Sequence, residues 1–176
     1  VAEREKTADL LKRIIEDRSV IVIEHDMGFV ENSASRVGDP IAAQSPSRVR
    51  RVVLASGKVY YDLVEGREEH VPDAAVSVAI VRVEQLYPWP GESLDAMLRN
   101  YPNVERIVWA QEEPANMGAW TFVRDRIQGA LRPEQDLAYA GRRESASTAT
   151  GSLRVHKQEQ RELVALAFAG LGWSRF

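Results

Sequence analysis

From residue 50 onward, short apolar runs rich in β-branched residues alternate with longer amphipathic segments. We interpret the apolar runs as strands: RRVVLAS (50–56), VSVAIVRV (76–83), ERIVWAQ (105–111) and LAYAGR (137–142). Helices are expected after them, at 57 to about 69, 93–100, about 119–130 and 156 to about 169. Strands separated by helices pair in parallel and are covered on both faces. The pattern predicts an α/β fold, a three-layer α/β/α sandwich with a mostly parallel sheet.

The first part of the chain does not follow this pattern. Residues 2–17 are predicted to form an amphipathic helix, residues 20–24 (VIVIE) a strand, and Asp26 to cap a second helix that runs to about Val37. The segment GDPIAAQSPS (38–47) has the glycine, prolines and serines of a linker. We therefore expect a short helix–strand–helix appendage at 1–37, a linker at 38–47 and an α/β domain at 48–176.

Composition excludes several classes of function. The net charge of −3 gives no reason to expect nucleic acid or an acidic membrane as a partner, and no apolar run is long enough to span a bilayer. The absence of cysteine excludes disulfides, cysteine nucleophiles and thiolate metal sites, and it fits a cytoplasmic protein. The three histidines do not have the spacing of metal ligands, so no metal site is expected.

The loops that follow the strands are the candidate sites, because they converge at one edge of a parallel sheet. Ser56, Gly57 and Lys58 lie where the first strand meets a helix, and a helix N-terminus with a lysine suits an anion. Arg142 and Arg143 precede a Ser/Thr-rich loop and are possible second contacts for a phosphate. The alternatives are a tight turn with a solvated lysine, and a solvated loop or an ion pair to a neighbouring domain.

Two adjacent carboxylates, Glu112 and Glu113, end the third strand and could do acid–base work. Successive residues of an extended chain point in opposite directions, so we expect them to cap the next helix or to bind at an interface, and not to act as a catalytic pair. Trp89, Trp109 and Trp120 are expected to fill the core or a domain interface.

Four blocks of this sequence resemble a known family. They are RRVVLASGKVYYDLVEGREE, VAIVRVEQLYPWP, IVWAQEEPANMGAW and YAGRRESASTATGSLRVHKQEQRELV. In order and spacing, residues 48–170 resemble the transketolase-like C-terminal domain of the decarboxylating component of 2-oxoglutarate dehydrogenase, a thiamine-diphosphate-dependent enzyme. The chain departs from the family at Ala55, Trp89 and Thr148, where cysteine, phenylalanine and proline are usual. Losing the proline should loosen the loop at 143–152.

The resemblance implies a domain that helps to build the dimer and the whole enzyme. Thiamine diphosphate, Mg²⁺ and the residues near the reacting carbonyl belong mainly to two earlier domains, so we expect no catalytic residue and no cofactor in this chain, which should be inactive alone. In the intact enzyme the implied reaction is decarboxylation of 2-oxoglutarate with succinyl transfer to lipoamide, in the tricarboxylic acid cycle. The implied partners are a second copy, the lipoamide succinyltransferase component and an acetyl-CoA or nucleotide effector, which favours the anion site.

Residues 1–37 resemble a different family, the end of an ABC-transporter ATPase domain of the urea or branched-chain amino-acid type. There the strand VIVIEHD would carry a histidine that senses the γ-phosphate of ATP, here His25. An ATPase also needs a G-x-x-x-x-G-K-[ST] loop and a carboxylate for Mg²⁺, and the sequence has neither motif. We therefore expect His25 to be a relic and the chain to be a chimera or fusion. A fragment of a transporter ATP-binding subunit is the alternative function, and a generic α/β ligand-binding module is a third.

Overall fold

The computed structural model describes residues 39–71 and 77–170, all in a compact unit that spans Gly38–Phe176. Its strands are β1 (Arg51–Ala55), β2 (Val78–Arg82), β3 (Arg106–Pro114) and β4 (Asp136–Arg142). They form one sheet in the order β2-β1-β3-β4, and every neighbouring pair is parallel.

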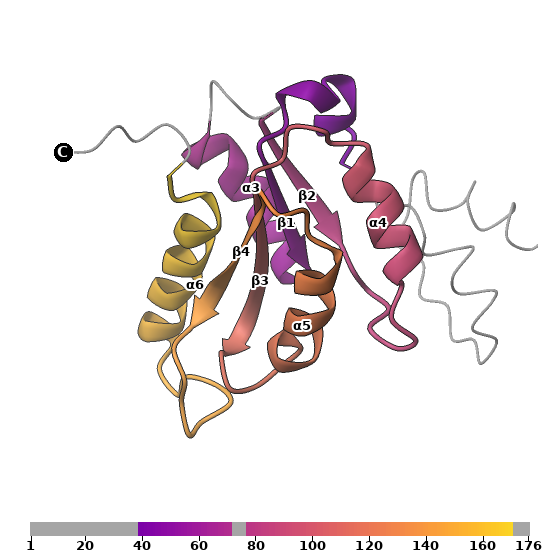
Figure 1. The fold of residues 1–176 in the computed structure, drawn as a ribbon. Coiled ribbons are helices and arrows are strands. Elements are labelled where there is room, and N and C mark those ends of the chain that lie inside the picture. The colour runs from indigo at the N-terminus through magenta and orange to yellow at the C-terminus, as the bar shows by residue number, and fades with distance from the viewer. Residues whose placement is uncertain (1–38, 72–76, 171–176) are drawn as a thin grey trace, which may run out of the picture. The chain divides into compact units, whose positions relative to one another are not determined.

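The α-helices of the described ranges cover both faces of this sheet. They are α3 (Val59–His70), α4 (Gly91–Arg99), α5 (Trp120–Ala130) and α6 (Leu153–Phe168). Helices α3 and α6 pack together on one side of the sheet, and α4 and α5 on the other (Figure 1). The predicted three-layer α/β/α fold is confirmed. Among the helices that the structure describes, none is both long and apolar enough to cross a membrane.

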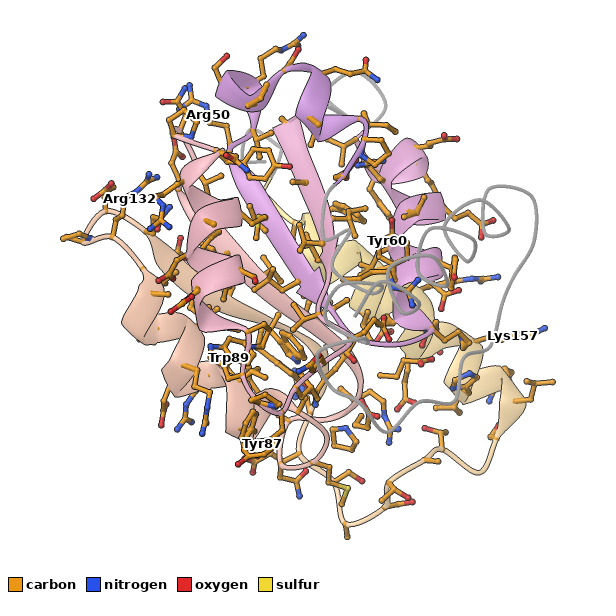
Figure 2. The ribbon with its side chains drawn as sticks, turned by 90° about the vertical axis from the view of Figure 1, so that its right-hand side faces the viewer. Arg50, Tyr60, Tyr87, Trp89, Arg132 and Lys157 are labelled. Atoms are coloured by element: carbon orange, nitrogen blue, oxygen red, sulfur yellow. The ribbon has the colours of Figure 1, made fainter. Side chains whose placement is uncertain are left out.

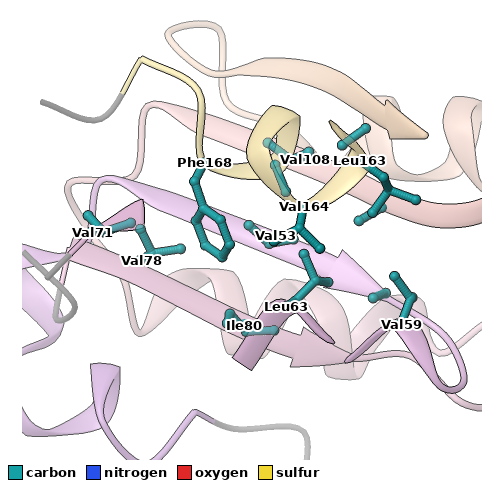
Figure 3. Packing of buried hydrophobic residues seen from close by; sticks show 14 residues of the cluster. Val53, Val59, Leu63, Val71, Val78, Ile80, Val108, Leu163, Val164 and Phe168 are labelled. Carbon is teal, nitrogen blue, oxygen red and sulfur yellow. The ribbon is translucent and has the colours of Figure 1, made fainter. Parts of the chain in front are cut away.

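Side chains of the central strands alternate between two cores. Val53 and Ala55 of β1 belong to the cluster under α3 and α6, where Leu163, Val164 and Phe168 of α6 meet the strands (Figure 3). The alternate residues of β1, such as Leu54, are also fully buried, so the strand has no solvated face. This explains why these strands appear in the sequence as continuous apolar runs.

Helices α3 and α6 approach each other closely at Gly66. A Cβ atom added at Gly66 would overlap Cγ1 of Val164, while the next nearest atoms, on His70 and Phe168, would be 3.7 Å away. Only a residue without a side chain fits this crossing, so Gly66 sets the distance between the two helices.

The segment that was expected to be a linker is packed against the domain where the structure describes it. Two short 3₁₀ helices, η1 (Ala42–Gln44) and η2 (Pro46–Arg48), lie there, and Ala42 is completely buried. Asp39 forms an ion pair with Arg67 of α3, and both side chains are only 3% exposed. Asp39 also accepts the backbone N–H of Ile80 in β2 at 2.8 Å. The buried part of the domain therefore begins by Asp39, earlier than residue 48, whereas the helices and strand expected within 1–37 lie outside the described residues.

Arg51 joins the first strand to the end of the last helix. Its guanidinium is buried and donates to the backbone carbonyls of Ala167 at 2.8 Å and Ala169 at 2.7 Å. A cation at a helix C-terminus interacts favourably with the helix dipole. Burial, with a smaller contribution from Arg106, lowers the pKa of Arg51 to about 10, so the group stays charged at neutral pH.

Candidate functional site

A pocket of about 560 Å³ lies at the carboxyl ends of the strands. The next two strands along the chain lie on opposite sides of β1, with β2 on one side and β3 on the other. In parallel sheets of this kind a crevice forms at the point where the strand order changes direction. We call this the switch-point pocket. It is lined by Ser56, Gly57, Leu86, Tyr87, Trp109, Gln111, Glu113, Gly118, Ala119 and Phe122. Tyr87 and Trp89 mark this end of the sheet in Figure 2, and Arg50 and Arg132 mark the opposite end.

Gln111 shapes the loop that forms one wall of the pocket. Its Oε1 accepts the indole N–H of Trp109 and the backbone N–H of Trp120, both at 2.9 Å. Its Nε2 faces the backbone carbonyls of Met117 at 2.8 Å, Pro114 at 3.2 Å and Glu113 at 3.3 Å. The side chain is almost fully buried, and the hydrogen-bonding groups of its carboxamide are all engaged within the protein. Gln111 is therefore part of the scaffold and has no free group for a ligand.

The loops after β3 and β4 are held together by further polar contacts. Asn116 donates to the carbonyl of Ser145 at 3.0 Å and accepts its N–H at 3.1 Å, like a short piece of sheet. The hydroxyl of Tyr139 lies 3.0 Å from the carbonyl of Glu113 and 3.2 Å from that of Arg142. At Gly141 an added Cβ would overlap the Tyr139 ring and come within 2.8 Å of the Gln111 carbonyl, so glycine is required there.

The predicted anion site at the start of α3 already has carboxylate partners. Lys58 Nζ lies 3.0 Å from Asp62 and 3.3 Å from Glu112, and its hydrogen bond to Asp62 raises its pKa above the ordinary value. The backbone N–H of Gly57 donates to Glu84 at 3.2 Å. An anion at Ser56, Gly57 and Lys58 would have to compete with these carboxylates.

The predicted second contacts lie at the same edge of the sheet. Arg142 donates to the Thr148 carbonyl at 3.2 Å and lies 3.4 Å from Glu159. It lines a smaller pocket of about 410 Å³ together with Glu112, the partner of Lys58. Arg143 is exposed and forms no ion pair with any residue that the structure describes. The fold thus brings the two predicted groups to one edge, with acidic side chains between them.

The two adjacent carboxylates have different surroundings. Glu112 pairs with Lys58, whereas Glu113 lies against Gly118, where an added Cβ would be 3.1 Å from Glu113 Oε2. Within 39–71 and 77–170, no three His, Asp or Glu side chains gather as a metal site.

The tryptophans and two further side chains complete the site. Trp109 is fully buried, Trp89 lies edge-on to Phe122 with 6.5 Å between ring centroids, and Trp120 packs on Tyr139 at 5.1 Å. Gln111 and Tyr139 organise these loops but were not singled out in the sequence. The only signal for Gln111 was a polar residue at the end of an apolar run, which many solvated positions share, and Tyr139 appeared as one more aromatic residue within a strand.

Comparison with known proteins identifies the family. The sequence model described as "2-oxoglutarate dehydrogenase C-terminal" matches residues 26–168. The 2-oxoglutarate dehydrogenase E1 component of Cupriavidus necator is 48% identical over 125 residues, which cover 71% of this chain and 13% of that protein. The E1 component of Coxiella burnetii is 43% identical over 124 residues, covering 70% and 13%, and that of Azotobacter vinelandii is 38% identical over 160 residues, covering 89% and 16%. The chain thus spans only 13% to 16% of the length of these relatives.

The comparisons also correct one expectation. The family match begins at residue 26, inside the segment that was expected to come from a transporter ATPase, and the match to the Azotobacter vinelandii protein takes in 89% of the chain. The ABC-transporter resemblance of residues 1–37, with the chimera and the ATPase alternative that follow from it, has no support. A short β-branched strand followed by His and Asp is too common to identify a family by itself. The chain belongs to the 2-oxoglutarate dehydrogenase C-terminal family.

Proposed function

We propose that this chain acts as the C-terminal assembly and regulatory domain of a 2-oxoglutarate dehydrogenase E1 enzyme. The family match across residues 26–168 carries the proposal. In the intact enzyme, thiamine diphosphate with Mg²⁺ would supply the decarboxylation of 2-oxoglutarate and the transfer of a succinyl group to lipoamide. A second copy and the lipoamide succinyltransferase component would be the protein partners, and the chain alone would be inactive.

The surface at the carboxyl edge supports an assembly role. Tyr87 is 80% exposed, and Trp89, Trp120, Phe122 and Tyr139 are partly exposed. Aromatic side chains are enriched in the contact surfaces between proteins. Gln111 binds the backbone N–H of Trp120 and would hold that ring in place for a neighbouring domain at little cost in entropy.

A domain exchange tests the assembly role. The matching C-terminal segment of the Cupriavidus necator E1 component would be replaced by residues 39–170 of this chain. We expect the exchanged enzyme to form the parent's oligomer and to decarboxylate 2-oxoglutarate, while the parent without its C-terminal segment should do neither. An exchanged protein that is folded by circular dichroism but neither assembles nor turns over would contradict the proposal.

A weak anion effector site around Ser56, Gly57 and Lys58, with Arg142 and Arg143, is part of the regulatory proposal. The shared sheet edge of the two groups supports it. Because carboxylates already pair with Lys58 and Arg142, we expect millimolar affinity for acetyl-CoA, about −4 kcal/mol.

The effector site can be tested by titrating acetyl-CoA into isotope-labelled protein. Backbone amide shifts should be centred on residues 56–58 and 142–143 and should weaken in Lys58→Ala. The matched control is Lys157→Ala, on the exposed start of α6 (Figure 2). Equal weakening in both variants would indicate that acetyl-CoA responds only to the overall charge.

A further inference from the structure

The switch-point pocket combines aromatic walls with one carboxylate and has no cation among its lining residues. Its large apolar side chains are Leu86, Tyr87, Trp109 and Phe122, and its one charged group is Glu113. We propose that this pocket binds an arginine side chain presented by a partner protein. The inference goes beyond the assembly role, because it concerns the chemistry of the pocket itself and can fail while the assembly role holds.

The negative charge of the pocket is available to a ligand. Glu113 forms no ion pair with any residue in the described part of the chain, although it lies beside Gly118 on the pocket wall. Cations of the neighbouring loops and of α5 are engaged elsewhere, since Lys58 pairs with Asp62 and Glu112, Arg142 with Glu159, and the Arg126 guanidinium lies over the Phe122 ring. A partner's guanidinium would therefore meet a carboxylate that has no ion-pair partner among the described residues.

The other polar groups of the pocket do not favour an anion. The Gln111 carboxamide is used up by its contacts within the loop, and the N–H of Gly57 donates to Glu84. An anionic ligand would thus find no free cation or free helix N–H among the lining residues, and it would be repelled by Glu113. Charge complementarity selects a cationic group.

The aromatic walls favour the planar guanidinium of arginine over the ammonium of lysine. A guanidinium stacks on aromatic rings and binds a carboxylate with two donors at once. The Arg126 guanidinium already lies 3.8 Å from the Phe122 ring centroid. The Tyr87 ring, which is 80% exposed, is therefore the wall on which a partner's guanidinium would stack. The pocket volume, about 560 Å³, is large enough for an arginine side chain with part of its peptide backbone.

The test uses the full isotope-labelled chain and two blocked tripeptides. One is glycyl-arginyl-glycine, and the other carries citrulline, which has nearly the same shape as arginine but no charge. We expect the arginine peptide to shift the amides of Gly57, Tyr87, Gly118 and Phe122 with millimolar affinity. The citrulline peptide should bind about tenfold more weakly, as expected for the loss of one charge-assisted interaction.

Two neighbouring variants separate the pocket from general surface charge. Glu113→Gln should weaken the arginine peptide about tenfold, whereas Glu112→Gln, which removes the same charge from the Lys58 side, should leave its affinity unchanged. The proposal is overturned if the arginine peptide shifts no pocket amide, if the citrulline peptide binds equally well, or if both variants weaken binding to the same extent. Each of these results leaves the domain-exchange test of the assembly role unaffected.

Discussion

Substituting Gly66 by alanine is a direct test of the contact between α3 and α6. In an open helix, glycine to alanine gains about 1 kcal/mol because the unfolded chain loses freedom and helix propensity rises. At Gly66 the new Cβ would overlap Cγ1 of Val164. Valine has one strongly preferred rotamer in a helix, so Val164 cannot turn away at little cost.

The gain from helix propensity and chain entropy opposes the cost of the steric overlap, and we expect the cost of the overlap to be larger. Inserting a methyl group into a closely packed core costs about 1–3 kcal/mol, so the net destabilisation of Gly66→Ala should be about 1 kcal/mol. For a domain of this size, that corresponds to a fall in melting temperature of about 3–5 °C. The matched control is Gly129→Ala in α5, where an added Cβ would have no atom within 4 Å, and it should raise stability by about 0.5–1 kcal/mol.

Chemical denaturation of four variants would decide the point. In a Val164→Ala background the overlap disappears, and Gly66→Ala should then stabilise the protein, like Gly129→Ala. This reversal of sign is the signature of a direct contact between the two side chains. If Gly66→Ala stabilises the protein in both backgrounds, the helices do not approach as closely as described and our reasoning is refuted.

Three further predictions concern other parts of the fold. Deleting residues 1–37 should leave a cooperative unfolding transition. Deleting 1–47 also removes Asp39 and leaves Arg67 buried without its carboxylate, so in denaturation experiments it should lower the free energy of unfolding by about 3–5 kcal/mol. Equal stability of the two truncated proteins would place the domain boundary after the linker. Gln111→Glu places a carboxylate against the backbone carbonyls that Nε2 now faces, so it should lower the free energy of unfolding at neutral pH by about 2–4 kcal/mol. An unchanged denaturation midpoint would show that the carboxamide does not hold the loop. Burial raises the pKa of Tyr139, so the stability that its hydroxyl contributes is fully present below the ordinary value of 10.0 and is lost above it; melting temperatures should fall less steeply above pH 10.0 in Tyr139→Phe than in the wild type, and parallel curves would contradict this.

The layers of the fold were predictable because burial on both faces leaves a simple pattern. Each central strand contains an apolar run, such as residues 52–55 of β1, and the helices between strands repeat apolar residues with helical spacing. The end of β3 was not predictable in the same way. The strand continues through the polar residues Glu112 and Glu113 to Pro114, which pairs with Arg142 after an irregularity in the register. Only the neighbouring strand determines that extension.

The packing of residues 39–47 was hidden for a related reason. Glycine, proline and serine mark a change of direction in the chain, but they do not show whether the turn is solvated or packed. Asp39 is buried because Arg67 lies opposite it, and Arg67 is 28 residues away in the sequence. In the same way the candidate cations Lys58 and Arg142 were recognisable as charged loop residues, while their carboxylate partners, Glu112 and Glu159, follow from the fold alone.

The contact of Arg51 with the end of α6 has a consequence for the way the domain opens. Helix ends ordinarily fray independently of the rest of a protein. Here the last carbonyls of α6 are bound by a buried guanidinium from a central strand, 116 and 118 residues earlier in the sequence. Unwinding the final turn would leave that charge buried and without partners, so local fraying is coupled to opening of the sheet. Loss of the last turn of α6 would therefore also destabilise β1, and a protease should cut within this turn mainly when the sheet opens as well.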